Sequence, residues 1–130
     1  MELTTHLRDA LLALAQANPD DEILGVLGAD GAGRVVAHEA VGLTESHPDH
    51  AVFTVDALDT ARQSITDAGR AVVGIYHSHP HGFARPSERD RLLIGEGEVM
   101  VVIGLRSHTP EITGWRLTAD RYRVVEEPLT

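Results

Sequence analysis

The hydrophobic residues of this chain change their spacing along the sequence, and each spacing predicts a type of secondary structure. Near the N-terminus, apolar side chains recur every three or four residues, which predicts an amphipathic helix. Thr4 or Thr5 is available as its N-cap, and Asn18-Pro19 is a stop signal. We expect this helix to pack on a sheet through the apolar stripe of Leu3, Leu7, Ala10, Leu11 and Leu14.

Short apolar or alternating runs predict strands in the rest of the chain. The runs at 23–28 and 34–41 flank Asp30-Gly31-Ala32-Gly33, and an Asp-Gly between two such runs favours a β-hairpin. A second helix is predicted between Asp56, as its cap, and Gly69. Further strands are predicted at 51–55, 71–76, 99–105, 111–117 and 122–126, and a polar loop at 42–50.

The stretch from His77 to Asp90 carries the candidate chemistry. His77 and His79 stand at the end of a predicted buried strand. Side chains two residues apart leave the same face of a strand, so both imidazoles can point at one metal ion while Ser78 points away. A catalytic zinc usually has three His or carboxylate ligands and a water. Asp90 is the candidate third ligand, because the turn residues before it can return the chain to the histidines.

A structural reading explains part of the same pattern. Ser87-x-x-Asp90 before Leu92-Leu93-Ile94 is also a capping box at the start of a helix. The two readings are compatible, because the N-terminus of a helix is a stiff mount for a ligand. The identity of the metal also stays open, since histidine and carboxylate ligands suit several divalent ions.

The whole pattern resembles the signature of a known family. His77-x-His79, seven residues and then Ser87-x-x-Asp90, with Gly74 before it, is similar to the motif of the JAB/MPN/Mov34 (JAMM) zinc metalloproteases in their compact prokaryotic form. The resemblance implies a cytidine deaminase-like three-layer α/β (α+β) fold, with a mixed central β-sheet flanked by helices. It also implies one zinc ion per chain, with His77, His79 and Asp90 as its ligands.

Two catalytic roles are implied by the same resemblance. Glu22, three residues before Gly25, matches the glutamate that holds the zinc-bound water, takes its proton and passes it to the leaving amine. Ser87 occupies the place where the family supplies a donor to the oxyanion. Taken alone, Glu22 is also readable as one of three acids in a solvated loop. His47 and His50 are interpreted as surface residues, and His81 as a loop residue.

Length, composition and charge limit the remaining possibilities. At 130 residues the chain is expected to be a single domain, 1–130. A formal charge of -9 argues against nucleic acid as a partner, and the absence of cysteine excludes a thiol nucleophile. No apolar run is long enough to span a bilayer, and the N-terminus lacks the pattern of a signal peptide. We therefore expect a cytoplasmic protein without a membrane partner.

The compact prokaryotic members of the family process ubiquitin-like sulfur-carrier proteins or small protein conjugates. The resemblance thus implies a zinc-dependent metallopeptidase or isopeptidase that cleaves next to the C-terminal glycine of a ubiquitin-like or sulfur-carrier protein with a Gly-Gly tail. Two alternatives stay open: a non-catalytic MPN-type interaction scaffold, and a same-fold zinc hydrolase acting on a small amide or a cell-wall-type peptide. The sequence also leaves the oligomeric state open, a homodimer included.

Overall fold

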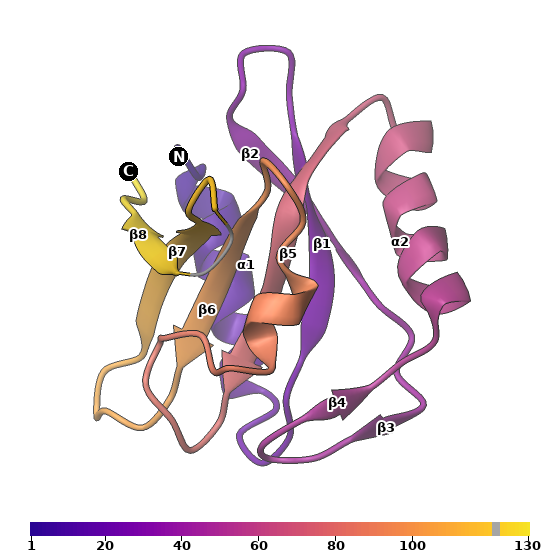
Figure 1. Ribbon diagram of the computed structural model, residues 1–130. Coiled ribbons are helices and arrows are strands. Elements are labelled where there is room, and N and C mark those ends of the chain that lie inside the picture. The colour runs from indigo at the N-terminus through magenta and orange to yellow at the C-terminus, as the bar shows by residue number, and fades with distance from the viewer. Residues whose placement is uncertain (121–122) are drawn as a thin grey trace.

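The computed structural model describes residues 1–120 and 123–130 and shows a mixed sheet with a helix on each face (Figure 1). This arrangement confirms the predicted three-layer α/β (α+β) class. The elements in chain order are α1 (Thr5–Gln16), β1 (Leu24–Ala29), β2 (Val35–Ala40), β3 (Glu45–Ser46), β4 (Ala51–Val52), α2 (Val55–Asp67), β5 (Ala71–His79), the 3-10 helix η1 (Asp90–Leu93), β6 (Val99–Gly104), β7 (Glu111–Leu117) and β8 (Val124–Glu127).

The main sheet places β5 at its centre. The strand order is β2-β1-β5-β6-β7-β8, in which β5 and β6 are parallel and the other pairs are antiparallel. Strands β1 and β6 are buried along their whole length, which is why each reads as a continuous apolar run in the sequence. Because β5 is hydrogen-bonded on both edges, its end is a rigid platform for side chains.

Each face of the sheet has its own hydrophobic core. On one face, Leu7 and Leu11 of α1 belong to a buried cluster that includes Tyr76 and Ile103. On the other face, Ala61 and Ile65 of α2 belong to a second cluster, with partners that include Val26, Ile75 and Met100. The alternation of side chains along β5 and β6 therefore serves both cores.

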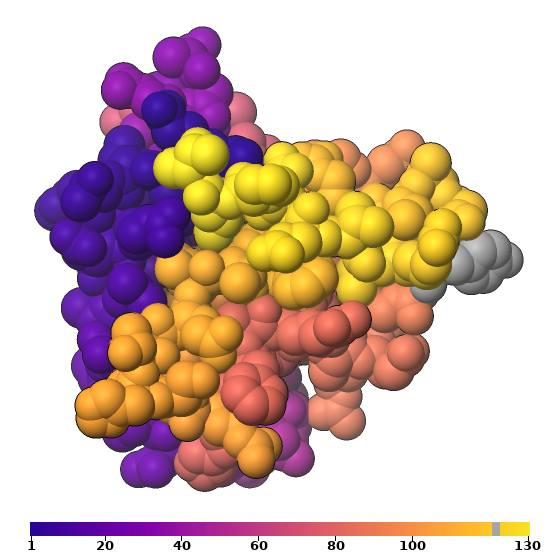
Figure 2. Space-filling model, turned by 90° about the vertical axis from the view of Figure 1, so that its left-hand side faces the viewer, coloured from indigo at the N-terminus to yellow at the C-terminus, as the bar shows by residue number. Residues whose placement is uncertain are grey.

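The two ends of the chain lie side by side. The N–H group of Leu3 donates to the carbonyl oxygen of Thr130 at 3.1 Å, and that of Thr130 donates to Met1 at 3.0 Å. Figure 2 shows the C-terminal residues, in yellow, lying against the N-terminal residues, in indigo, on this face of the molecule. In the described residues, no helix is long and apolar enough to cross a membrane.

The structure confirms most of the predicted elements and corrects two boundaries. Thr4 caps α1, and the hairpin forms at Asp30, as predicted. The predicted strand 51–55 is wrong beyond Val52, because Thr54 caps α2 through a hydrogen bond from the N–H group of Ala57, a role predicted for Asp56.

Three further outcomes concern the loops and the C-terminal strand. The loop 42–50 contains β3, which pairs with β4 outside the main sheet. The helix predicted after Ser87 is only the four-residue η1. In the predicted strand 122–126, residue 122 lies outside the described residues, and β8 covers Val124–Glu127.

Candidate metal centre

Two histidines and an aspartate converge at the C-terminal end of β5. The Nε2 atoms of His77 and His79 lie 2.9 Å apart. Asp90, at the start of η1, places its Oδ2 atom 3.0 Å from Nε2 of His77 and 2.9 Å from Nε2 of His79. His77 and Asp90 are buried, with exposed fractions of 3% and 7%. The structure therefore brings the three predicted ligands to one point.

Asp90 is held in place by Ser87 through two reciprocal hydrogen bonds. The N–H group of Ser87 donates to Oδ2 of Asp90 at 2.8 Å, and the N–H group of Asp90 donates to Oγ of Ser87 at 3.2 Å. This is the capping pattern that the spacing of the two residues predicted. The same carboxylate oxygen faces the imidazoles, so the capping interaction is compatible with a ligand role for Asp90.

A backbone contact fixes the ring nitrogen that His79 presents to the site. Its Nδ1 atom lies 2.8 Å from the carbonyl oxygen of Phe83, which can only accept, so Nδ1 carries a proton. In the neutral ring, Nε2 then presents a lone pair to Asp90. Burial lowers the pKa of His79, but hydrogen bonds with Asp90 and Phe83 outweigh burial and raise that pKa.

The two Nε2 atoms and Oδ2 of Asp90 all carry lone pairs, so at these distances a proton or a metal ion must lie between them. Burial raises the pKa of Asp90, but hydrogen bonds with His77 and His79 outweigh it and bring that pKa well below its usual range. An ionised carboxylate in a buried site needs a counter-charge, either a proton on an imidazole or a metal ion. Two imidazoles and one carboxylate are also a donor set that divalent zinc accepts. The residues therefore fit a zinc ion.

Glu22 lies beside this group, just before β1. Its Oε1 atom is 4.0 Å from Nε2 of His79. One ligand atom each from Glu22, His77 and His79 lies within 4.8 Å of the other two, so Glu22 is close enough to join a metal site. Burial, followed by the negative charge of Asp90, raises the pKa of Glu22 to about 7. A carboxylate with that pKa can both take and give a proton near neutral pH.

Two serines that sequence analysis did not assign to the site bind the backbone of Glu22 and of its neighbour Ile23. Oγ of Ser46, in β3, donates to the carbonyl oxygen of Glu22 at 2.6 Å. The N–H group of Glu22 donates to the carbonyl of His47 at 2.9 Å. On the other side, Oγ of Ser78 accepts from the N–H group of Ile23 at 3.0 Å. Side chains alternate along β5, so Ser78 points away from the histidines. This alternation was the one sequence feature that could have indicated that Ser78 contacts a neighbouring strand.

The site opens to solvent through a cavity of about 300 Å³. Its lining includes Glu22, His79 and Ser87, and also His81, which was predicted to be a loop residue. Ser87 is exposed there, so its hydroxyl can reach a molecule in the cavity.

The two histidines of the 42–50 segment lie near the site without joining its ligand atoms. The rings of His47 and His50 stack at 4.3 Å, with an angle of 20° between their planes. His47 pairs with Glu45 at 3.2 Å and His50 pairs with Asp49 at 2.8 Å. Each of the two imidazoles therefore has an acidic partner of its own, outside the group of His77, His79 and Asp90.

Comparison with known proteins identifies the family. Residues 4–118 match the family described as prokaryotic homologs of the JAB domain, and the chain therefore belongs to it. A probable metalloprotease of Haloferax volcanii is 32% identical over 96 residues, which cover 73% of this chain and 59% of that protein. The chain thus matches little more than half the length of this relative.

Solved structures support the fold. A protein from Desulfitobacterium hafniense is 30% identical with a TM-score of 0.76, over 99% of this chain and 90% of that one. A protein from Salinibacter ruber is 28% identical with a TM-score of 0.72, over 100% and 90% of the two chains. A JAB1/MPN domain protein from Archaeoglobus fulgidus has a TM-score of 0.61 at 18% identity, over 100% and 96%, and supports the fold alone.

Proposed function

We propose that the chain is a zinc-dependent metallopeptidase or isopeptidase acting next to the C-terminal glycine of a ubiquitin-like or sulfur-carrier protein. The observation that carries the proposal is the meeting of His77, His79 and Asp90 within 3.0 Å, with Glu22 4.0 Å from His79. Membership of the JAB family and the Haloferax volcanii relative, named a probable metalloprotease, support metal-dependent hydrolysis.

The proposed ligands are His77, His79 and Asp90. A bound zinc ion lowers the pKa of a coordinated water and polarises a carbonyl group. Glu22 then accepts the proton of the attacking water on a carboxylate oxygen and delivers it to the leaving nitrogen. Its raised pKa, about 7, suits both transfers, because a group that titrates near the working pH exchanges protons readily.

Ser87 is the proposed donor to the oxyanion. Its Oγ atom accepts the N–H group of Asp90, which uses an oxygen lone pair and leaves the O–H proton available to the cavity. A hydroxyl that donates to the developing negative charge stabilises the transition state more than the ground state. Ser87 therefore has two proposed roles: it donates to the oxyanion, and its hydrogen bonds hold Asp90 in position.

A substrate with a Gly-Gly tail suits the position of the site. The candidate base and one histidine line an open cavity at the surface, where an extended tail without side chains can lie with its carbonyl beside Ser87. The folded body of the carrier stays outside the cavity. This substrate class rests on the family resemblance and on the opening of the cavity to solvent.

The experiment is a cleavage assay on a sulfur-carrier protein whose Gly-Gly tail is fused to a short peptide. We expect the zinc-loaded protein to release the peptide after the second glycine, and a chelator to abolish the release. Glu22→Gln is the matched inactive variant, because it keeps the size of the side chain and removes the proton acceptor. The proposal fails if cleavage is absent in the zinc-loaded protein, or is equal in parent and variant. Zinc uptake without cleavage would favour an interaction scaffold.

A further inference from the structure

Positive charge gathers beside the candidate metal centre of an otherwise acidic chain. The formal net charge is -9, and the 11 basic residues are all arginines. Three of them, Arg85, Arg89 and Arg91, fall in the seven residues that also contain Ser87 and Asp90. The same seven residues contain two acids, Glu88 and Asp90, so their formal charge is +1, opposite in sign to that of the chain as a whole.

A groove of about 350 Å³ runs along this segment. Its lining includes Arg85, Arg91 and Arg123, against the single carboxylate of Glu88. Ser87 lines both this groove and the cavity over Glu22. The groove thus adjoins, at Ser87, the place where the scissile bond is proposed to lie.

Two of these cations line the groove without a carboxylate partner in the part of the chain that the structure describes. The guanidinium of Arg85 lies over the ring of Trp115, 5.7 Å from its centroid, and the Nε1 atom of Trp115 donates to the carbonyl of Ala84 at 3.1 Å. Among the described residues, neither Arg85 nor Arg123 forms an ion pair, and both are exposed. Arg91 differs, because it lies 3.4 Å from Glu88.

We propose that the groove binds acidic side chains of the polypeptide substrate, on the Ser87 side of the scissile bond. This inference rests on the proposed function. Guanidinium groups match carboxylates in charge and in the geometry of two parallel hydrogen bonds. An acidic partner is repelled by the net charge of this chain, so a local cationic groove directs its approach to the site.

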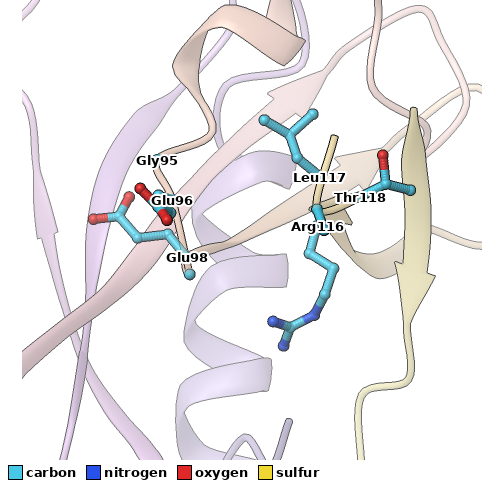
Figure 3. A pocket seen from close by; sticks show the side chains of 8 residues that line it. Gly95, Glu96, Glu98, Arg116, Leu117 and Thr118 are labelled. Atoms are coloured by element: carbon cyan, nitrogen blue, oxygen red, sulfur yellow. The ribbon is translucent and has the colours of Figure 1, made fainter. Parts of the chain in front are cut away.

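A second cavity of about 270 Å³ offers less (Figure 3). It lies between the turn before β6 and the end of β7, with Glu96 and Glu98 on one side and Arg116 on the other. Glu98 pairs with Arg62 at 2.7 Å, and Arg116 pairs with Glu127 at 2.7 Å. Because Glu98 and Arg116 are already paired, the groove lined by Arg85 and Arg123 is the stronger candidate for a binding site.

The test measures binding separately from cleavage. The probe is a fluorescein-labelled peptide with a run of glutamates followed by Gly-Gly, and the reference peptide carries glutamines. Fluorescence anisotropy is read with the zinc-loaded protein. The variant Arg85→Gln/Arg123→Gln is compared with Arg8→Gln/Arg70→Gln, which changes the net charge equally away from the groove. Arg70 stands next to the start of β5, at the opposite end from the histidines.

We expect the groove variant to bind the glutamate peptide roughly 3- to 10-fold more weakly than the parent, as two partly exposed ion pairs would give. The control variant should change binding by less than about twofold, and added salt should narrow the difference. The inference is overturned if both variants bind the peptide equally. It is also overturned if a labelled oligothymidylate binds more tightly than the glutamate peptide.

The two proposals fail separately. If the carrier fusion is not cleaved but the glutamate peptide still distinguishes the two variants, the hydrolase proposal falls and the anion-binding groove stands. If the fusion is cleaved and the groove variant matches the parent in binding and in kcat/KM, the groove proposal falls alone. The substituted side chains are exposed or partly exposed, so the variants are expected to fold, and thermal unfolding checks this.

Discussion

Ser78 and Ile23 exchange two hydrogen bonds that join the histidine-bearing strand to the neighbour of the candidate base. The N–H group of Ile23 donates to Oγ of Ser78 at 3.0 Å, and the N–H group of Ser78 donates to the carbonyl of Ile23 at 3.2 Å. Ser78 is fully buried. Because Ile23 follows Glu22 directly, the side chain between the two histidines helps to set where the carboxylate of Glu22 lies.

Ser78→Ala should therefore reduce catalysis without removing the metal. The substitution leaves the N–H group of Ile23 without its acceptor, which costs about 1–3 kcal/mol of unfolding free energy. It also frees the backbone beside Glu22, so kcat should fall while KM and the zinc content stay near the parent values. Ser78→Thr keeps the hydroxyl and should recover most of kcat. Equal kcat in the parent and Ser78→Ala would contradict this positioning role.

Asp90 and Glu22 should separate metal binding from catalysis. Asp90→Ala removes the carboxylate oxygen that lies 2.9–3.0 Å from both histidines, so zinc content should fall towards that of the His77→Ala/His79→Ala double variant. Glu22→Gln should retain zinc and lose hydrolysis. Elemental analysis of the purified variants measures the first effect, and the carrier-fusion assay measures the second.

The opposite outcome is informative because Glu22 also lies within ligand distance of the histidines. If Glu22→Gln loses zinc and Asp90→Ala retains it, Glu22 is the ligand and the assigned roles are exchanged. The zinc-to-protein ratio of these two variants decides between the assignments.

The part of the site that was predictable from sequence depends on local geometry. His77 and His79 are two residues apart on one strand, and Ser87 and Asp90 form a capping pair, so short-range rules place each pair. The turn residues between the pairs indicated that the two pairs could meet, and the family motif joined them. In the structure, the loop between them brings Asp90 to the histidines.

The features that sequence reasoning missed depend on tertiary contacts. Nothing within β3 indicates that Ser46 donates to Glu22, because the contact spans 24 positions. The early end of the strand at Val52 reflects competition, since Thr54 gains a capping hydrogen bond that an extended strand would not provide. Propensity alone does not resolve such choices.

Ser87→Ala should lower the rate by about 100-fold or more, as expected for removal of one oxyanion donor. The hydroxyl also accepts from the N–H group of Asp90, so zinc affinity should weaken as well. Assays at saturating zinc isolate the catalytic effect, and a zinc titration with a competing chelator reports the mounting effect. Ser107→Ala, in the loop before β7, is the control. A loss of rate that excess zinc fully restores would leave no role for Ser87 as a donor.

The metal-free protein should lose stability as the pH rises from about 4.5 to about 7. Burial raises the pKa of Glu22 from 4.5 to about 7 in the folded state. Between these values the unfolded chain releases the proton while the folded chain keeps it, so the unfolding free energy falls with rising pH. Glu22→Gln stays neutral and avoids this loss. With a chelator present, its gain in Tm over the parent should be larger at pH 8 than at pH 5.

Zinc provides the control for that measurement. A bound cation favours the charged form of a nearby carboxylate, so the difference between Glu22→Gln and the parent at pH 8 should shrink or reverse when zinc is added. A difference in Tm that is the same at pH 5 and pH 8 in the metal-free proteins would show that Glu22 titrates normally.

Gly74 should be intolerant of a side chain because the backbone of the neighbouring strand occupies the space. A Cβ atom at this position would overlap the carbonyl oxygen of Val99, with which Gly74 is in register in the β5–β6 pair. Gly74→Ala therefore has to push apart the parallel strands, and we expect a loss of at least about 2 kcal/mol in urea unfolding. Gly31→Ala is the matched control, since no atom lies within 4 Å of its added Cβ. It should change stability by no more than about 1 kcal/mol. His77 lies three residues further along β5, so zinc affinity should also fall in Gly74→Ala. A urea midpoint equal to that of Gly31→Ala would contradict the packing argument.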